Sequence, residues 1–195
     1  IGAFRKAFED TSDYFKVVWA NDIDKYACQV YRKQYGSDTM IEEDITKLDK
    51  ATMKPVDLLV GGFPCQSFSY AGKKLGFNEQ RGKLFFEMAK YIQEHKPLLV
   101  LLENVKGLLT HDKEKTFFTI IKTLNDLGYV VDFRVLNSKN FNVPHNRERI
   151  FILATNVNKL DAYPLLKEMI VKGFIIEKFI GYMRGISKKQ LKLLN

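Results

Sequence analysis

Short apolar runs alternate with stretches of helical periodicity along most of the chain. Apolar and β-branched runs that stop at Gly, Asn or Asp favour strands, whereas apolar residues three and four apart favour amphipathic helices. The pattern predicts strands over residues 15–20, 56–60, 98–102, 129–136 and 150–154. It predicts helices over residues 3–9, 23–35, 84–95 and 113–127.

The alternation of strands and helices indicates an α/β fold, with a mostly parallel sheet and helices on both faces. Ligands of such sheets bind beyond the carboxyl ends of the strands. Polar clusters follow three of the predicted strand ends, namely Asn21-Asp22, Pro64-Cys65 and Glu103-Asn104. We therefore expect these clusters to contribute to one shared site.

The C-terminal part of the chain has a different pattern. Residues 156–195 contain interspersed basic and apolar residues, without a clear alternation of predicted strands and helices. We expect one domain over residues 1–154, followed by a linker or the start of a second region over residues 155–195. The chain opens on Ile1 rather than Met, and we expect residues upstream of it to be missing.

Composition narrows the class of protein. Hydrophobic residues at 46% and charged residues at 28% are ordinary for a soluble globular domain. The net charge of +8 favours a polyanionic partner such as nucleic acid, although a basic balance alone is weak evidence. Two cysteines without a CxxC pair suggest a reducing compartment, and no apolar run reaches the ~18 residues of a membrane span. These features predict a cytoplasmic protein without a membrane partner.

Cys65 is the first candidate for chemistry. It follows Pro64 in a glycine-rich loop at a predicted strand end, where an exposed thiol can approach a ligand. A free cysteine is also commonly a small buried hydrophobe, and the loop by itself leaves both interpretations open. Cys28 lies on the expected core face of a helix, where the structural role is favoured.

Charged residues near other strand ends form a second group of candidates. Glu103 directly follows five apolar residues, where a carboxylate is costly unless it is paired or functional. Arg147 and Arg149 are alternate residues before a strand, so both guanidinium groups can face one site. An exposed helix start for Glu103 and a solvated edge for the arginines remain the alternatives.

Asp22 and Asp44 each follow a strand-like segment, where a carboxylate commonly binds the ribose hydroxyls of a nucleoside cofactor. Gly2, at a turn into a helix, allows close approach of the backbone to a ligand. The three histidines are His95, His111 and His145. Their spacing along the chain is not that of metal ligands, so no metal site is expected.

Taken together, these segments resemble the cytosine-5 DNA methyltransferase family of the bacterial or phage restriction–modification type. The resemblance runs in order from residue 1 to about residue 154. Its elements are Gly62-Phe63-Pro64-Cys65-Gln66, the segment from Arg81-Gly82-Lys83 to Phe86, Glu103-Asn104-Val105, and Arg147-Glu148-Arg149.

The resemblance implies a Rossmann-like S-adenosylmethionine-dependent fold and methyl transfer from S-adenosylmethionine to C5 of a cytosine flipped out of double-stranded DNA. It implies that the Cys65 thiolate adds to C6 of the base and that Glu103 hydrogen-bonds N3. Arg149 is expected to hold O2, with Arg147 as support. The implied cofactor-binding residues are Gly2, Phe4, Asp22, Ile23, Asp44, Ile45, Pro64 and Leu84.

The chain also departs from the family pattern. It begins inside the expected cofactor loop, so we expect residues 1–154 to be a catalytic domain without the family's first strand. We expect the target recognition region and the final conserved helix to be absent from this sequence, and residues 155–195 to be a linker or the start of the target recognition region. A second chain or a missing C-terminal segment is therefore expected to read the target sequence, and the chain alone is expected to bind the cofactor poorly or to be inactive.

Three alternatives stay open. The chain is a fragment or subunit of a split DNA enzyme, a related enzyme that acts on transfer RNA, or an inactive DNA-binding module. The Gly-Phe pair before Pro64 favours the DNA enzymes. An ordinary nicotinamide-binding fold is disfavoured because the sequence contains no GxGxxG.

Overall fold

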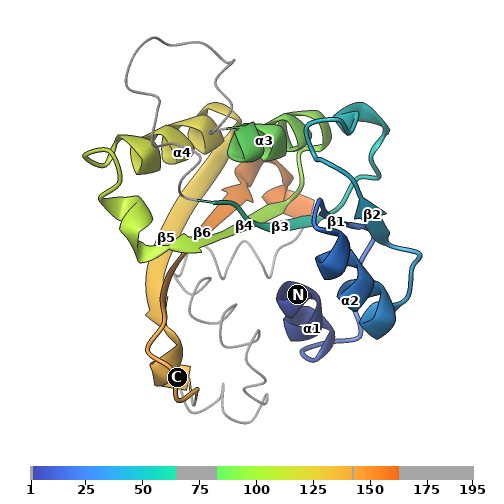
Figure 1. Cartoon of the computed structure of the whole chain (residues 1–195). Helices are drawn as coiled ribbons and strands as arrows, with labels where there is room; N and C mark the ends of the chain where they lie inside the picture. Colours follow the sequence, from blue (N-terminus) through green and yellow to red (C-terminus); the bar gives the residue numbers. More distant parts are fainter. Residues whose placement is uncertain (1, 65–82, 142, 163–195) are drawn as a thin grey trace. The chain divides into compact units, whose positions relative to one another are not determined.

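The computed structural model describes residues 2–64, 83–141 and 143–162. The chain divides into two compact units. Residues 2–49 are the described part of the first unit, and the remaining described residues, from Lys50 onward, belong to the second. Figure 1 labels the helices and strands of both units.

The first unit consists of α1 (Ala3–Glu9), β1 (Ala20–Asp22), α2 (Lys25–Tyr35) and β2 (Met40–Glu42). The two strands are parallel, with Ala20 opposite Met40 and Asp22 opposite Glu42. Helix α2 begins where the Asp24 carboxylate accepts the backbone N–H of Ala27 at 2.7 Å, which is an ordinary N-cap.

The core of this unit is formed by Phe8, Cys28 and Tyr31, which are nearly or fully buried. Cys28 is 0% exposed, which confirms its expected structural role, and burial raises the pKa of its thiol. The expected strand over residues 15–20 is wrong, since β1 begins only at Ala20. The apolar character of the preceding segment serves packing instead, because the rings of Phe15 and Phe8 lie 4.8 Å apart.

The second unit contains a four-stranded sheet in the order β3-β4-β6-β5. Its strands are β3 (Leu58–Gly62), β4 (Leu99–Val105), β5 (Tyr129–Asn137) and β6 (Glu148–Asn156). Its α-helices are α3 (Lys83–His95) and α4 (Lys115–Asp126). Short 3-10 turns cover Lys50–Thr52, Lys106–Leu109, Ser138–Phe141 and Val157–Ala162.

Strands β3 and β4 are parallel, whereas β6 runs antiparallel to both β4 and β5. The α/β fold class is confirmed, but the expected mostly parallel sheet is corrected to a mixed one. The reason is the short connection between β5 and β6, which contains only a 3-10 turn in its described part. Parallel neighbours need a longer crossover, usually a helix, so a short connection produces an antiparallel pair.

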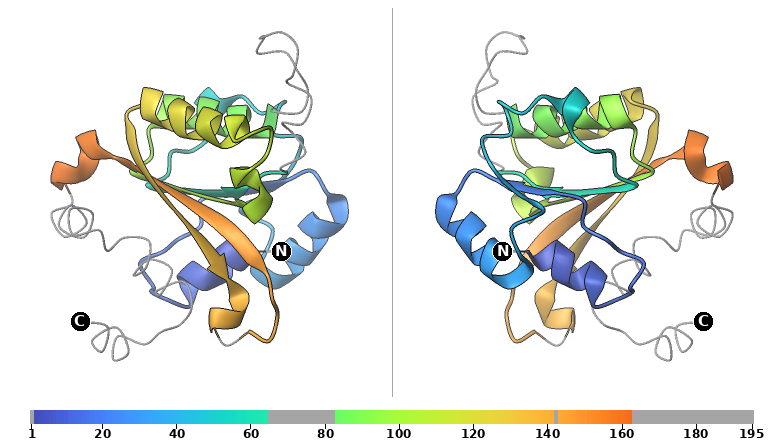
Figure 2. Two further views of the ribbon diagram at one scale, coloured as in Figure 1. Left: turned by 90° about the vertical axis from the view of Figure 1, so that its left-hand side faces the viewer. Right: turned by 90° about the vertical axis from the view of Figure 1, so that its right-hand side faces the viewer.

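Helices α3 and α4 lie on the same face of this sheet, as both views in Figure 2 show. Their inner residues pack against the central strands, and the fully buried side chains include Phe85, Ile92, Ile120, Val100 and Ile150. Helices on both faces of the sheet stay a prediction, because no second layer belongs to the described part of this unit.

Helix α4 begins two residues later than the expected Lys113. Asp112, Lys113 and Glu114 all have positive φ values, of 48°, 53° and 70°, which are incompatible with a right-handed helix. Within the described residues, no helix has the length and apolar character needed to cross a membrane.

Candidate active site

The carboxyl end of β4 carries the first expected catalytic residue. Glu103 and Arg149 come from antiparallel neighbours, in which Val105 lies opposite Arg149 and Glu103 lies opposite Phe151. The two side chains are therefore diagonal neighbours on one face of the sheet. Arg149 Nε lies 2.8 Å from Glu103 Oε1, and the side chains are 21% and 29% exposed. The structure thus brings together the carboxylate and the guanidinium that the sequence placed far apart.

A second ion pair lies at the same strand ends. Lys106 Nζ is 3.0 Å from Glu148 Oε2, and both side chains are largely exposed. Since successive strand residues point to opposite faces, Glu148 points away from the face that carries Arg149. Arg147 lies one residue before β6 and is exposed, with its backbone N–H donating to Asn137 Oδ1 at 3.2 Å.

Cys65, the expected nucleophile, lies outside the described residues. The chain that leads to it is held firmly, however, because the buried Asn104 donates from Nδ2 to the Phe63 carbonyl oxygen at 2.7 Å. Phe63 is 5% exposed, and its ring lies 5.6 Å from that of Phe85 on α3. The residue two positions before Cys65 is therefore attached to the strand that carries Glu103.

The glycines at the end of β3 make this arrangement possible. Gly62 lies opposite Glu103 in the parallel pair, and a Cβ at Gly62 would be 3.2 Å from Glu103 Oε2. A Cβ at Gly61 would collide with the end of the Met88 side chain on α3. The two glycines thus leave room for the carboxylate and for α3, a role that the sequence reasoning missed.

Sequence reasoning also assigned no separate role to Asn104. The sequence feature that could have indicated this role is an amide side chain next to Glu103 at the end of an apolar strand, because a buried amide needs a hydrogen-bond partner. The expected cofactor residues Pro64 and Leu84 belong to the same unit as Glu103 and flank the segment 65–82. Pro64 is exposed, and Leu84 is half-buried in the first turn of α3.

The remaining expected cofactor residues lie in the first unit. Asp22 ends β1 and Asp44 follows β2, so the parallel pairing brings them to the same edge. Asn21 holds this edge together, since its Nδ2 donates to the carbonyl oxygens of Ile41 at 3.1 Å and of Glu43 at 2.8 Å. The Glu43 backbone N–H in turn donates to the Asp22 carbonyl at 3.2 Å.

The residues at this edge have the chemistry that a nucleoside requires. Asp22 and Asp44 are half-buried carboxylates, each of which accepts a backbone N–H two residues ahead at 2.9 Å. Ile23 exposes 68% of its apolar side chain and Ile45 is half-buried, which suits the faces of an adenine. Gly2 has the left-handed φ of 70°, and Phe4 is half-buried in the first turn of α1. These residues therefore fit a nucleoside cofactor. Carboxylates can bind ribose hydroxyls, apolar side chains can pack on an aromatic base, and a glycine allows close approach of the backbone.

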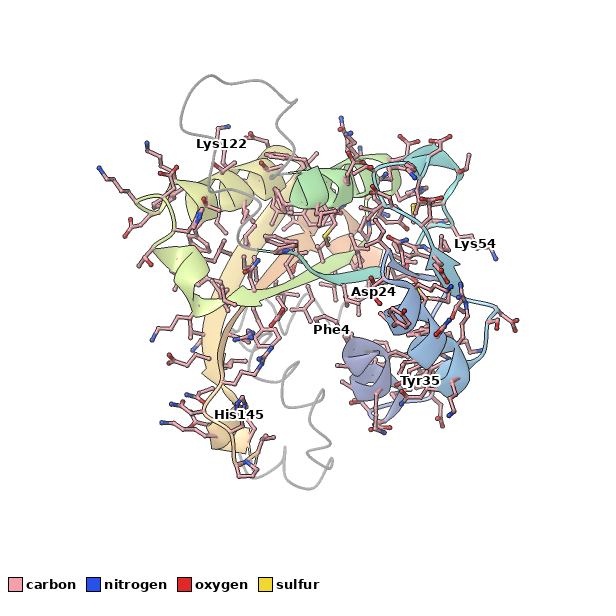
Figure 3. All side chains as sticks on the ribbon, in the orientation of Figure 1. Phe4, Asp24, Tyr35, Lys54, Lys122 and His145 are labelled. Carbon is pink, nitrogen blue, oxygen red and sulfur yellow. The ribbon has the colours of Figure 1, made fainter. Side chains whose placement is uncertain are left out.

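The histidines have structural contacts or lie at the surface. His95 Nε2 is 2.6 Å from the Lys50 carbonyl oxygen, and His111 Nδ1 is 2.7 Å from Thr116 Oγ1. His145 is exposed in the connection between β5 and β6 (Figure 3). Among the described residues, no three His, Cys, Asp or Glu side chains form a group that could hold a metal ion.

The chain has the α/β fold of solved methyltransferase structures. Solved structures with the same fold include the Dnmt2 methyltransferase of S. pombe, with a TM-score of 0.64 and 21% identity over 83% of this chain and 52% of that chain. A mutant of DNMT2 from Spodoptera frugiperda has a TM-score of 0.65 and 25% identity over 81% of this chain and 48% of that chain.

The chain belongs to the C-5 cytosine-specific DNA methylase family, which matches residues 1–180. The Type II methyltransferase M1.ScrFI of Lactococcus lactis subsp. cremoris is 43% identical over 97% of this chain and 49% of its own length. The Type II methyltransferase M.SsoII of Shigella sonnei is 46% identical over 92% of this chain and 48% of its own length. The chain spans about half the length of these curated relatives. S-adenosylmethionine is the cofactor of this methyltransferase family.

Proposed function

We propose that the chain carries the catalytic machinery of a DNA (cytosine-5-)-methyltransferase of the restriction–modification type. The observation that carries the proposal is the ion pair between Arg149 and Glu103. Glu103 lies on β4, and the neighbouring Asn104 hydrogen-bonds the Phe63 carbonyl, two residues before Cys65. The Type II methyltransferases among the relatives support DNA as the substrate. Double-stranded DNA is the proposed partner, and the net charge of +8 favours contacts with its phosphates.

The described residues define how the base is held in this proposal. A cytosine flipped out of the duplex presents O2 and N3 on one edge. The Arg149 guanidinium donates to O2, and Glu103 hydrogen-bonds N3, so that charge developing on the ring is stabilised. The fixed diagonal between β4 and β6 sets the spacing of these two groups. Arg147 supports this end of the site as a second cation.

The covalent steps belong to Cys65. Its thiolate forms a bond to C6, and the electrons of the C5–C6 double bond make C5 nucleophilic. S-adenosylmethionine, when bound, supplies the methyl group that C5 takes. Transfer of the C5 proton to a solvent base then restores the C5–C6 double bond as the C6–S bond breaks and returns the thiolate.

The edge formed by β1 and β2 holds the cofactor in this proposal. Asp22 binds the ribose hydroxyls, and Ile23 packs on the adenine. Asp44 and Ile45 contact the adenine edge. Gly2 and Phe4 contribute from the turn into α1, and Pro64 and Leu84 line the methionine side.

The test is a trapped covalent adduct. The chain, alone and with a candidate partner chain, is incubated with labelled S-adenosylmethionine and duplex DNA containing 5-fluorocytosine, from which the fluorine cannot leave as the proton does. We expect an adduct that Cys65→Ser abolishes and that the matched control Cys28→Ala retains. An adduct with transfer RNA but with no DNA would overturn the proposal in favour of an RNA enzyme. The absence of an adduct with either nucleic acid would favour an inactive module.

A further inference from the structure

Gly2 has an unusual environment for a residue at the start of a helix. Its carbonyl oxygen accepts the first helical hydrogen bond of α1, from the Lys6 backbone N–H at 2.9 Å. The same oxygen lies 3.4 Å from the hydroxyl of Tyr35, which donates to it from the last residue of α2. Two donors from different helices therefore converge on one carbonyl.

The Tyr35 ring also occupies the space beside Gly2. A Cβ at Gly2 would lie 2.5 Å from Tyr35 Cε2, closer than real Cβ atoms come to other atoms, and 3.2 Å from Tyr35 Cζ. Glycine is thus required here twice, by its left-handed φ of 70° and by the ring behind it. Figure 3 labels Tyr35 where α1 and α2 meet.

Tyr35 is itself held by a cation. The Arg5 guanidinium carbon lies 4.4 Å from the centroid of the Tyr35 ring and 5.7 Å from that of Tyr31. Arg5 also donates to Tyr31 Oη at 3.1 Å, to Thr39 Oγ1 at 3.3 Å and to Glu9 Oε1 at 2.8 Å. A cation over an aromatic face is attractive, and more so when it is partly withdrawn from water. The position of the ring is therefore determined from both sides.

Helix α2 connects this contact to the opposite end of the proposed cofactor site. Its N-terminal end follows Asp22 and Ile23 directly, and its last residue is Tyr35. The contact with Gly2 therefore fixes the turn into α1 relative to the helix that begins beside the ribose-binding carboxylate. Binding to a turn that is already ordered avoids the cost of ordering it.

We propose that Tyr35 is a positioning residue for S-adenosylmethionine, which keeps the Gly2 turn in its binding conformation through its ring and hydroxyl. The inference rests on the proposed function, in which Gly2 and Phe4 contact the cofactor. Tyr35 touches Gly2 and Arg5 rather than the reacting atoms, so it acts through the turn.

The experiment uses the full chain with three substitutions. Tyr35→Leu removes the ring, Tyr35→Phe removes only the hydroxyl, and Tyr26→Leu makes the same change on the same helix at a side chain that is 75% exposed. The dissociation constant for S-adenosylmethionine is measured by calorimetry. Hydrogen exchange of the Lys6 amide, which reports on the Gly2 carbonyl, is measured without cofactor, and thermal unfolding shows that each variant folds.

We expect Tyr35→Leu to weaken cofactor binding by about tenfold, because the turn must be ordered on binding. Exchange of the Lys6 amide should accelerate by about tenfold as its hydrogen bond weakens. Tyr35→Phe should weaken binding by less than about threefold, since a hydroxyl at 3.4 Å contributes little. Tyr26→Leu should change neither quantity.

Unchanged exchange in Tyr35→Leu overturns the inference, and so does accelerated exchange with an unchanged dissociation constant, because Tyr35 is then structural only. If the parent chain itself binds no S-adenosylmethionine, the proposed function of this site fails instead. The exchange of the Lys6 amide still decides in that case whether Tyr35 orders the turn.

Discussion

Arg149 Nε lies 2.8 Å from Glu103 Oε1, so the two side chains proposed to hold the cytosine edge are paired with each other. The pair is preorganised by the antiparallel register of β4 and β6 rather than by a flexible loop. Both side chains are partly exposed, at 21% for Arg149 and 29% for Glu103, so they remain accessible to a substrate.

The planar geometry of the guanidinium leads to the first prediction. Arg149→Lys keeps the positive charge but loses the flat fork that can face a carboxylate and a carbonyl together. We expect methyl transfer to fall by about 100-fold, as for loss of one oriented donor, with little change in thermal stability. The measurement is the single-turnover rate with duplex DNA, for the chain together with the candidate partner chain.

A matched control lies at the same strand ends. Lys106→Gln breaks the exposed pair with Glu148, which is on the opposite face and contributes about 1 kcal/mol or less. Its single-turnover rate should stay within about twofold of the parent rate, since a surface pair of this kind has little effect. A loss in Arg149→Lys no larger than in this control would contradict the proposed role.

Asn104 gives a prediction about the loop that carries the nucleophile. Asn104→Ala removes the buried hydrogen bond to the Phe63 carbonyl, and such a loss costs about 2 kcal/mol of unfolding free energy. The approach to Cys65 is then less well fixed, so we expect slower adduct formation with 5-fluorocytosine DNA. Denaturant unfolding and adduct kinetics measure the two effects separately. Asn158→Ala, at an exposed position, should affect neither.

Gly62 should be sensitive to the smallest possible side chain. In Gly62→Ala the new methyl group lies 3.2 Å from Glu103 Oε2, so the carboxylate must move by a few tenths of an ångström. A misplaced catalytic group can lower the rate by about 10- to 100-fold, and we expect this with less than about 1 kcal/mol of destabilisation. Gly107→Ala is the control, because a Cβ there meets nothing within 4 Å. Equal rates for the two variants would show that the carboxylate position is not critical.

The two ion pairs of the buried Glu87 side chain predict a pH effect on stability. Glu87 Oε2 is 2.9 Å from Lys50 Nζ and Glu87 Oε1 is 2.7 Å from Lys90 Nζ, with only 9% of the Glu87 side chain exposed. Burial opposes ionisation, but the hydrogen bonds from Lys90 and Lys50 outweigh it and hold the pKa of Glu87 below its ordinary value. A lowered pKa in the folded state stabilises the fold above the unfolded value of about 4.3, and that stabilisation is lost as the pH falls through the folded value.

We therefore expect Glu87→Gln to lower the unfolding free energy at pH 7 by about 3 kcal/mol, as for a broken buried pair. The difference from the parent chain should shrink as the pH falls below about 4.3. Asp126→Asn, which removes the exposed pair with Lys122, should cost about 0.5 kcal/mol or less. A difference between Glu87→Gln and parent that is constant from pH 7 to pH 3 would count against this assignment.

Much of the fold follows from local pattern. The helices at residues 3–9 and 84–95 and the strands that begin near residues 129 and 150 lie within two residues of their expected positions. The pattern of apolar residues determines these elements, because each helix has only one apolar face and each strand only one apolar run that can be buried. The segment at residues 15–20 shows where this reasoning fails, because a β-branched and aromatic run can also pack as irregular chain.

The sequence by itself determined the family motifs and the order in which they occur, since motif and residue type are local properties. Only the tertiary structure decided that Glu103 and Arg149 form a pair, because their distance depends on the antiparallel register of β4 and β6, in which Leu101 lies opposite Leu153 and Glu103 lies opposite Phe151. The same holds for Asn104 with Phe63 and for Tyr35 with Gly2, whose contacts join distant segments. Side chains that position others leave no periodic signal in the sequence, and packing alone shows what they touch.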